Sequence, residues 1–202
     1  MVLKNSIRIL SFFVVVMLAI PATNVFAKDK QPMSGQEKLV QAMGNDALKE
    51  LTKKNPTDAD RRRQMAKLLD KYFDIKAIAR FAMGRNWKKA SKKQRSEYVK
   101  LFRSMVIETY AERFKEYSGE KFNVTGIKSL GRDVMVHSKV KPDDGPALKI
   151  DWRVRDTGGK KYRVIDVFIE GVSMGFTKQA EFKEIIHGGG GDVEVLLAEL
   201  RK

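Results

Sequence analysis

The chain has 202 residues, of which 40 are lysine or arginine and 25 are aspartate or glutamate, so its formal net charge is +15 at pH 7. It contains no cysteine and only two histidines. Disulfide bonds, thiol catalysis and cysteine-ligated metals are therefore excluded, and a histidine metal centre has few ligands to draw on.

The N-terminal segment has the three parts of a secretory signal peptide. Residues 1–8 carry two cations and no acid, residues 9–20 are almost wholly apolar, and a small-x-Ala site ends at Ala27. The apolar run is shorter than the roughly 20 residues that cross a bilayer, which argues against a retained membrane anchor. We predict cleavage after Ala27 and export from the cytoplasm.

After a signal peptide over residues 1–27, we predict a flexible lead-in over residues 28–35 and a single domain over residues 36–202. For an exported protein, the polyanions available to a basic surface are membranes with acidic lipids rather than nucleic acid. The alternative is that the cations only keep surface helices solvated.

The first half of the domain has the three- and four-residue spacing of apolar side chains that is typical of helices. It predicts a helix over residues 36–54 and a helical stretch over about residues 60–83 that breaks near Asp74. A third helix is predicted over residues 91–117. Its first residue, a serine, has a glutamine three positions on, which is the spacing of a capping box.

The second half alternates apolar and polar residues, which is the two-residue period of strands. Short turns between consecutive strands require antiparallel pairing. The fold class is therefore predicted as α+β, with a helical half, a four-stranded antiparallel sheet and two C-terminal helices. The strands are expected at residues 121–129, 134–140, 148–154 and 161–169, and the final helices at residues 180–187 and 193–201.

The last of these strands is apolar on both faces. Ile165, Val167 and Ile169 alternate there with Val164 and Phe168. A central strand that is covered on both sides has this pattern, and so has a strand with the core on one face and a cavity on the other.

Residues 171–175 fit the G-x-S-x-G motif, whose serine is a nucleophile in hydrolases. That chemistry needs a parallel sheet, and an acid followed by a histidine after the serine. Here the sheet is predicted to be antiparallel, and the only later histidine precedes the only later aspartate. A tight strand-to-helix turn is the favoured explanation of the motif. The less favoured alternative is an enzyme in which either Ser173, as in a small esterase, or the paired polar groups Asp166 and Glu170 would act.

Metal binding has little support. His137 is predicted on the polar side of a strand, among Ser138 and Lys139, and a zinc ion there would need carboxylates from elsewhere. The four glycines at residues 188–191 lack the Lys-Ser/Thr of a P-loop. We predict no catalytic residue, no metal and no cofactor.

Two basic clusters are the most notable surface features. Solvated helix faces explain them simply, but they also suit docking on an anionic membrane or an acidic partner protein. Trp87 is the only aromatic residue there that could stack on a base, which disfavours nucleic acid. The docking candidates are Arg61, Arg62, Arg63, Lys88, Lys89 and Lys92.

Several short segments, in their order and spacing, resemble the MlaC family, also called toluene-tolerance auxiliary proteins. Those of the helical half are Phe73-Asp74-Ile75, Ala79-Arg80, Gly84-Arg85-x-Trp87, Gln94, Leu101-Phe102 and Thr109-Tyr110. Those of the sheet are Ile150-Asp151-Trp152-Arg153, residues 162–167 and Glu170-Gly171-Val172-Ser173. The resemblance spans about residues 36–200. Gln179 departs from it, because the family tends to place a basic residue there.

The resemblance implies a periplasmic lipid carrier that is not an enzyme. Helices and a curved sheet would enclose an apolar pocket for phospholipid acyl chains. The carrier would serve an ABC-type lipid transport system, shuttling lipid between an outer-membrane lipoprotein complex and an inner-membrane MCE/ABC-type transporter, and would help to maintain outer-membrane lipid asymmetry. Another apolar lipid, such as a hopanoid, is the alternative cargo.

The pocket is expected to be lined by large or flexible apolar side chains, which adapt to irregular ligands. For any single residue, packing in the core is the alternative role. The expected pocket residues are Phe73, Ile78, Phe81, Phe102, Met105, Val106, Tyr110, Val136, Ile150, Trp152, Val154, Val164, Phe168, Val172 and Met174.

Overall fold

The computed structural model describes residues 32–51, 56–113, 121–142 and 145–202. The predicted signal peptide lies outside these residues, as do the predicted helix ends at residues 52–54 and 114–117. Residues 33–202 form one unit. Its helices are α1 (Gly35–Leu51), α2 (Asp58–Tyr72), α3 (Ile75–Met83), α4 (Asn86–Lys89), α5 (Lys92–Arg113), α6 (Met174–Gly188) and α7 (Val193–Leu200). Its strands are β1 (Lys121–Leu130), β2 (Asp133–Lys141), β3 (Leu148–Asp156), β4 (Tyr162–Ile169) and β5 (Val172–Ser173).

The strands form one antiparallel sheet in the order β1-β2-β3-β4-β5. The predicted α+β class is confirmed, with one strand more than expected, because the two residues of β5 pair with the end of β4. The pairing is irregular between Val124 and Gly126 and again between Arg153 and Val154. Such bulges increase the twist of a sheet.

Helices α2 and α3 are separated by the break that was predicted near Asp74. Phe73 ends α2 in an extended conformation and forms a parallel bridge with Val164 of β4. The Asp74 N–H donates to the Val164 carbonyl at 3.0 Å, and the Asp74 carboxylate caps α3 by accepting the Ala77 N–H. The break therefore fastens the helical half to the sheet.

Helix α6 begins at Met174, well before the predicted start at residue 180. The Ser173 hydroxyl accepts the Phe176 N–H at 3.1 Å and donates to the Asp166 carboxylate at 2.6 Å. Asp166 also accepts the Gly175 N–H at 3.0 Å. A serine cap and a carboxylate at the positive end of a helix both stabilise its first turn, which outweighs the preference of glycine for turns.

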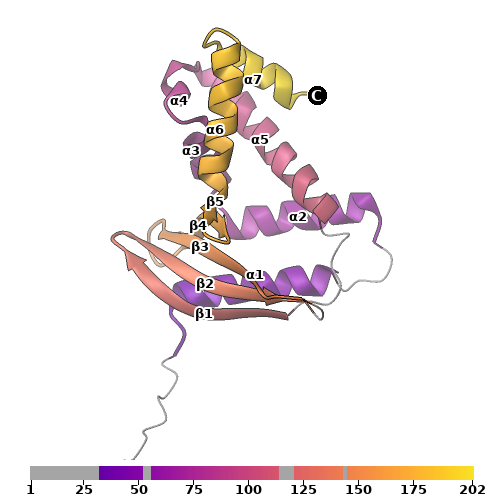
Figure 1. Ribbon diagram of the computed structural model, residues 1–202, viewed down its shortest axis with the longest axis vertical. Helices are drawn as coiled ribbons and strands as arrows, with labels where there is room; N and C mark the ends of the chain where they lie inside the picture. Colours follow the sequence, from indigo (N-terminus) through magenta and orange to yellow (C-terminus); the bar gives the residue numbers. More distant parts are fainter. Residues whose placement is uncertain (1–31, 52–55, 114–120, 143–144) are drawn as a thin grey trace, which may run out of the picture. The chain divides into compact units, whose positions relative to one another are not determined.

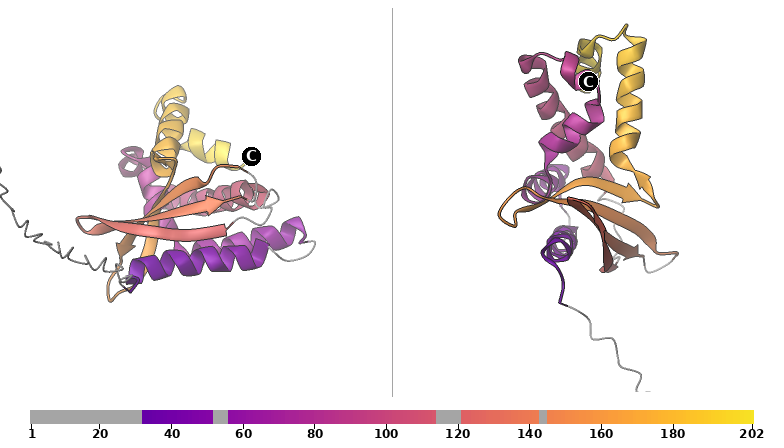
Figure 2. Two further views of the ribbon diagram at one scale, coloured as in Figure 1. Left: turned by 60° about the horizontal axis from the view of Figure 1, so that its bottom comes forward. Right: turned by 90° about the vertical axis from the view of Figure 1, so that its left-hand side faces the viewer.

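Helices α1 and α2 lie along the sheet, and α3, α6 and α7 pack with α5 beyond the end of β4 (Figure 1). Figure 2 shows the same grouping from two other sides. Helix α1 contacts β1, β2 and β4, whereas α2 contacts β4 and α5. One face of the sheet is thus covered by two helices.

Buried side chains form three clusters among the described residues. The bundle cluster joins α3, α5, α6 and α7 and consists of Ala79, Ala82, Met83, Ala90, Tyr98, Phe102, Phe182, Ile186, Val193, Leu196 and Leu197. The sheet cluster joins α1 and α2 to the strands and consists of Val40, Met43, Leu68, Tyr72, Val136, Val154 and Val164. The α2–α5 cluster consists of Met65, Leu69, Ile107 and Ala111.

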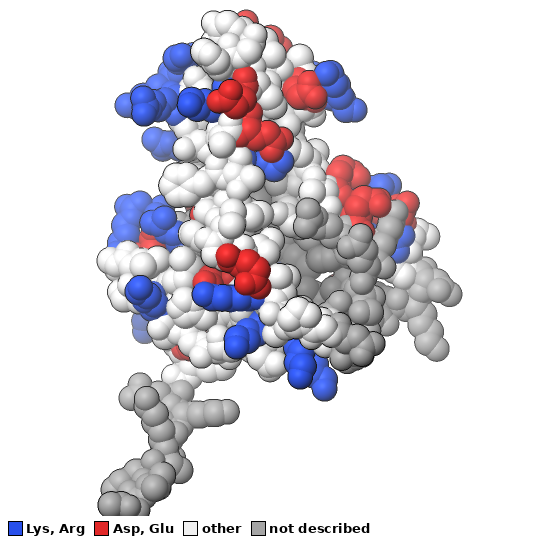
Figure 3. Space-filling model, viewed as in Figure 1, with Lys and Arg blue, Asp and Glu red and all other residues white. Residues whose placement is uncertain are grey.

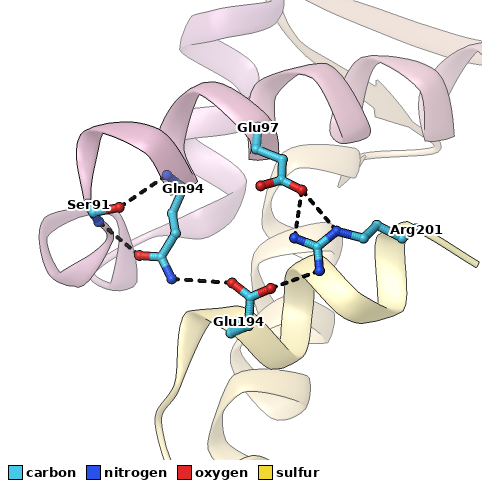
Figure 4. A network of polar contacts seen from close by, with 5 residues as sticks. All are labelled: Ser91, Gln94, Glu97, Glu194 and Arg201. Atoms are coloured by element: carbon cyan, nitrogen blue, oxygen red, sulfur yellow. Dashed lines mark hydrogen bonds and ion pairs between the residues drawn. The ribbon is translucent and has the colours of Figure 1, made fainter.

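Helix α7 is also held by polar contacts on the surface of α5 (Figure 4). Arg201 donates to Glu97 at 2.6 Å and 2.9 Å and to Glu194 at 2.8 Å. Ser91 and Gln94 form the predicted capping box, and the Gln94 amide reaches Glu194 at 3.5 Å. Exposed pairs of this kind contribute little individually, so the bundle cluster supplies most of the docking energy of α7.

Candidate functional site

A row of aromatic rings crosses the covered face of the sheet. The Trp152 ring of β3 lies edge-on to the Phe73 ring at a centroid distance of 6.5 Å and to the Phe122 ring of β1 at 6.4 Å. All three side chains are half-buried and pack against the sheet cluster. Edge-to-face contacts fix ring orientation, so the row is an ordered apolar surface that its protein neighbours do not fully cover.

The polar edge of the central ring is satisfied inside the fold. The Trp152 Nε1–H donates to the Ser138 hydroxyl at 2.9 Å, and that hydroxyl donates to the Ile150 carbonyl at 2.7 Å. Ser138 is fully buried, so its predicted place on the polar side of the strand beside His137 is wrong. Side chains alternate along a strand, and Ser138 shares the face of Val136. The row therefore presents carbon, with its one N–H already bonded.

Helix α1 approaches the first ring of the row very closely. A Cβ added at Gly44 would lie 2.2 Å from the Phe122 ring, so only glycine leaves room for that ring beneath α1. Hydrogen bonds also join α1 to α2, since Lys71 and Tyr72 of α2 donate to Asp46 of α1 at 2.7 Å and 2.6 Å. These hydrogen bonds, that of Lys71 first, lower the pKa of Asp46.

The three buried clusters meet at half-buried apolar residues. Phe73 packs against both the sheet cluster and the α2–α5 cluster, and Ile75 and Val106 pack against both the α2–α5 cluster and the bundle cluster. Seams between packed cores, lined by carbon, are where an apolar ligand finds contact surface without breaking a core.

The family description "MlaC protein" matches residues 41–202. This chain belongs to the MlaC family.

Two related proteins agree with this assignment. Over 108 aligned residues the chain is 27% identical to the intermembrane phospholipid transport system binding protein MlaC of Haemophilus influenzae. The aligned stretch covers 51% of this chain and 50% of the relative. The chain thus spans about half the length of that curated relative. It also resembles the solved structure of a phospholipid-binding protein from Ralstonia solanacearum in complex with a phospholipid, with a TM-score of 0.71 and 25% identity over 83% of this chain and 96% of that one.

Within this MlaC fold, the predicted pocket residues are distributed over several places. Those in or against the sheet cluster are Phe73, Val136, Trp152, Val154 and Val164. Those in or against the bundle cluster are Ile78, Phe102, Met105 and Val106, and Tyr110 packs on the α2–α5 cluster. Ile150, Phe168 and Met174 are half-buried, Phe81 meets Phe176, and Val172 is 56% exposed.

The most deeply buried members of that set, Phe102, Val136, Val154 and Val164, are at most 2% exposed and act as core in the described structure. The half-buried members remain predicted pocket residues. Sequence reasoning missed further half-buried residues against the sheet cluster, namely Leu39, Ala47, Phe122, Val124, Val134, Tyr162 and Val167. The alternation of Phe122 and Val124 with polar neighbours in β1 is the pattern that would have indicated two of them.

The opposite face of the sheet carries a buried carboxylate. Asp133 is fully buried and accepts hydrogen bonds from Arg155 at 2.7 Å and 2.9 Å and from Arg153 at 2.8 Å. These contacts, that of Arg155 first, hold the pKa of Asp133 below its usual range. The group is structural, because a buried carboxylate that is fully hydrogen-bonded stabilises the strands that supply its partners.

His137 lies on this same face and pairs with Asp151, with 2.9 Å between Nδ1 and Oδ1. Lys149 approaches the same carboxylate at 3.5 Å. In the part of the chain that the structure describes, no group of three or more histidine, cysteine, aspartate or glutamate side chains is placed to hold a metal ion.

Ser173 of the G-x-S-x-G motif is 7% exposed. Its hydroxyl hydrogen is donated to Asp166 and its oxygen accepts the Phe176 N–H. The predicted strand-to-helix turn is therefore confirmed as the place of this serine, and its hydroxyl forms part of the cap of α6.

The two predicted basic clusters differ in their partners. Arg61 pairs with Asp58, Arg63 lies 3.5 Å from Asp60, and Arg62 lies 3.6 Å from Glu108. Acidic neighbours thus offset the arginine cluster of α2.

Lys88, Lys89 and Lys92 form no ion pair with any described residue. Lys92 lines an open groove of about 530 Å³, which we call the basic groove. It is lined by Lys76, Trp87, Lys92, Arg95, Ser96, Val99 and Lys100.

None of the helices traced in the structure is both long and apolar enough to cross a bilayer.

Proposed function

We propose that this chain is a periplasmic carrier that holds the acyl chains of a phospholipid against the aromatic row on the covered face of the sheet. The observation that supports this best is the half-buried Phe73–Trp152–Phe122 row at a seam between packed clusters. A phospholipid-bound relative of the same fold supports the same ligand class.

The energetics explain why such a surface is needed. A diacyl phospholipid exposes some 30 methylenes, and each costs about 0.8 kcal/mol in water, so bare transfer is opposed by roughly 24 kcal/mol. A carrier must replace this hydration with apolar contact and still release its cargo. Half-buried rings and thioethers suit that compromise better than a fully packed core does.

The carrier is proposed to act without chemistry on its cargo. The observation behind this part is that the Ser173 hydroxyl is bonded to Asp166 and caps α6. Its place in the cell is proposed to be the periplasm, reached by a signal peptide that is cleaved after Ala27. There it would shuttle lipid between an outer-membrane lipoprotein complex and an inner-membrane MCE/ABC-type transporter, in support of outer-membrane lipid asymmetry.

The test is transfer of a fluorescent phospholipid from donor to acceptor vesicles. The purified mature chain is expected to raise the transfer rate in proportion to its concentration and to leave the lipid chemically intact. A rate equal to the spontaneous rate at every protein concentration would reject the carrier function. Release of free fatty acid that is lost in Ser173→Ala would favour an esterase instead.

A further inference from the structure

The basic groove is lined by residues of three helices, one of which supplies a tryptophan. Lys76 comes from α3, Trp87 from α4, and Lys92 and Lys100 from α5. None of these three lysines forms an ion pair with another described residue. The groove therefore concentrates positive charge that the described part of the protein leaves uncompensated.

Acidic side chains are almost absent from this part of the sequence. Residues 76–100 contain nine lysines and arginines and a single acid, Glu97. Arg201 of the C-terminal end holds Glu97 at 2.6 Å, on the side of α5 that meets α7 (Figure 4). In Figure 3, lysine and arginine gather at the upper left, over the place of α4 in Figure 1. The lone acid is thus neutralised by Arg201.

One cation and one ring of the groove are fixed in place. The Arg95 guanidinium donates to the Trp87 carbonyl at 2.8 Å and to the Lys88 carbonyl at 3.2 Å, and lies 5.5 Å from the centre of the Trp87 ring. The Tyr98 ring lies edge-on to the Trp87 ring at a centroid distance of 6.4 Å. These contacts hold the Trp87 ring and the Arg95 guanidinium in fixed positions in the lining of the groove.

The kind of cation discriminates between two classes of partner. Six of the nine cations are lysines, a residue that is depleted in protein–protein interfaces, where arginine is enriched. A lysine is a point charge on a flexible stem and needs no matched geometry. Clusters of four to eight cations with an interfacial tryptophan are typical of proteins that lie on anionic bilayers.

We propose that the basic groove docks this protein on the surface of an anionic lipid bilayer. This rests on the proposed carrier function, because a carrier must approach a membrane to load or release lipid. Lys76, Lys92 and Lys100 contact lipid phosphates, Trp87 lies at the headgroup level, and the arginine cluster of α2 takes no part because its acids offset it.

The test measures binding of the mature chain to vesicles of phosphatidylcholine with 30% phosphatidylglycerol, and to vesicles of phosphatidylcholine alone. The variant Lys92→Glu/Lys100→Glu alters the groove but keeps Arg95, which bonds to the α4 backbone. The control Arg62→Glu/Arg63→Glu makes the same change in net charge on α2. Melting curves and the amount of co-purified phospholipid are recorded for each variant.

The groove variant is expected to bind the anionic vesicles at least tenfold more weakly than the unchanged chain, since each surface cation contributes measurably to attraction by acidic lipid. The control is expected to stay within about threefold, and both to retain the same bound phospholipid. Equal losses in the two variants would show a mere net-charge effect and overturn the proposal. Absence of binding to anionic vesicles would also overturn the proposal. If such a protein still retained its bound phospholipid, the carrier function would stand and an acidic protein would be favoured as the partner of the groove.

Discussion

The ring of Phe73 lies edge-on to the ring of Trp152 at 6.5 Å because the backbone of Phe73 is bridged to Val164 of β4. Phe73 is the residue at which α2 stops, and it packs against two buried clusters at once. The helix break thus places an aromatic side chain at a seam between cores, and the proposed acyl-chain site depends on it.

Filling the covered face should displace lipid, whereas the same change on the opposite face should not. Val134 is half-buried against the sheet cluster, and its neighbour Met135 is half-buried on the other face. Val134→Trp is expected to weaken phospholipid binding by about tenfold, or about 1.4 kcal/mol, because the ring takes the space of the acyl chain. Met135→Trp is the matched control. Equal loss of labelled phospholipid in both variants would contradict the placement of the site.

The hydroxyl of Ser138 should contribute more to stability while Trp152 has an N–H to satisfy than after that N–H is removed. Ser138→Ala leaves the indole N–H without its acceptor and is expected to destabilise the fold by about 1–3 kcal/mol. In a Trp152→Phe background the same change should be markedly less costly. Urea unfolding of the four proteins in this cycle measures the coupling, and a coupling near zero would show that the hydrogen bond does not orient the ring.

Gly44 should tolerate no side chain, unlike a glycine elsewhere in a helix. Gly44→Ala puts a Cβ 2.2 Å from the Phe122 ring and is expected to destabilise the protein by about 1–3 kcal/mol through overpacking. Gly188 of α6 has open space around it, so Gly188→Ala serves as the control. If thermal unfolding shows Gly44→Ala to be as stable as the control, the close approach of α1 to β1 is not rigid.

Asp133 should stabilise the sheet at neutral pH and lose that role in acid. Its pKa is lowered in the folded state, mainly by Arg155, while the unfolded chain has an aspartate pKa of about 3.9. The contribution is therefore complete above about pH 4 and is lost as the pH falls through the folded-state pKa. Asp133→Asn is expected to destabilise by about 2 kcal/mol at pH 7.

The gap in melting temperature between Asp133→Asn and the unchanged chain should stay constant from pH 8 to pH 5 and narrow below about pH 4. Glu181→Gln, which removes only an exposed contact with Lys178, is the control. A gap that widens in acid would reverse the assigned sign of the pKa shift.

Ser173→Ala should affect stability and leave ester hydrolysis unchanged. Loss of the α6 cap is expected to reduce the free energy of unfolding by about 1 kcal/mol. Ser104→Ala, at an exposed position within α5, is the control for the loss of a serine that does not cap a helix. Hydrolysis of a chromogenic ester that falls in Ser173→Ala but persists in Ser104→Ala would restore the esterase alternative.

The sequence was sufficient for the elements with strong periodicity. The break at Asp74, the Ser91 capping box and the antiparallel order all follow from local patterns and short turns. The start of α6 did not, because the Asp166 carboxylate that accepts the Gly175 N–H comes from another strand. The ion-pair partners of Arg61 and Arg63 could be predicted from the sequence, because Asp58 and Asp60 precede them at the three-residue spacing of a helix face.

The candidate site was predictable in chemistry but not in membership. An apolar side chain such as Val164 has the same sequence pattern whether it fills a core or lines a cavity, and the structure places it fully in the sheet cluster. Phe122 was missed because its importance comes from contact with Trp152 on a strand two places along the sheet. Ser138 was assigned to the wrong face because polarity, and not register, was used to place it.

Native mass spectrometry of the mature chain shows whether phospholipid binds on the covered face of the sheet. We expect an added mass equal to that of a phospholipid. Labelled phospholipid should exchange with this bound lipid, and Val134→Trp should deplete it while Met135→Trp does not. A chain that carries no lipid as purified and takes up no labelled phospholipid would contradict this expectation.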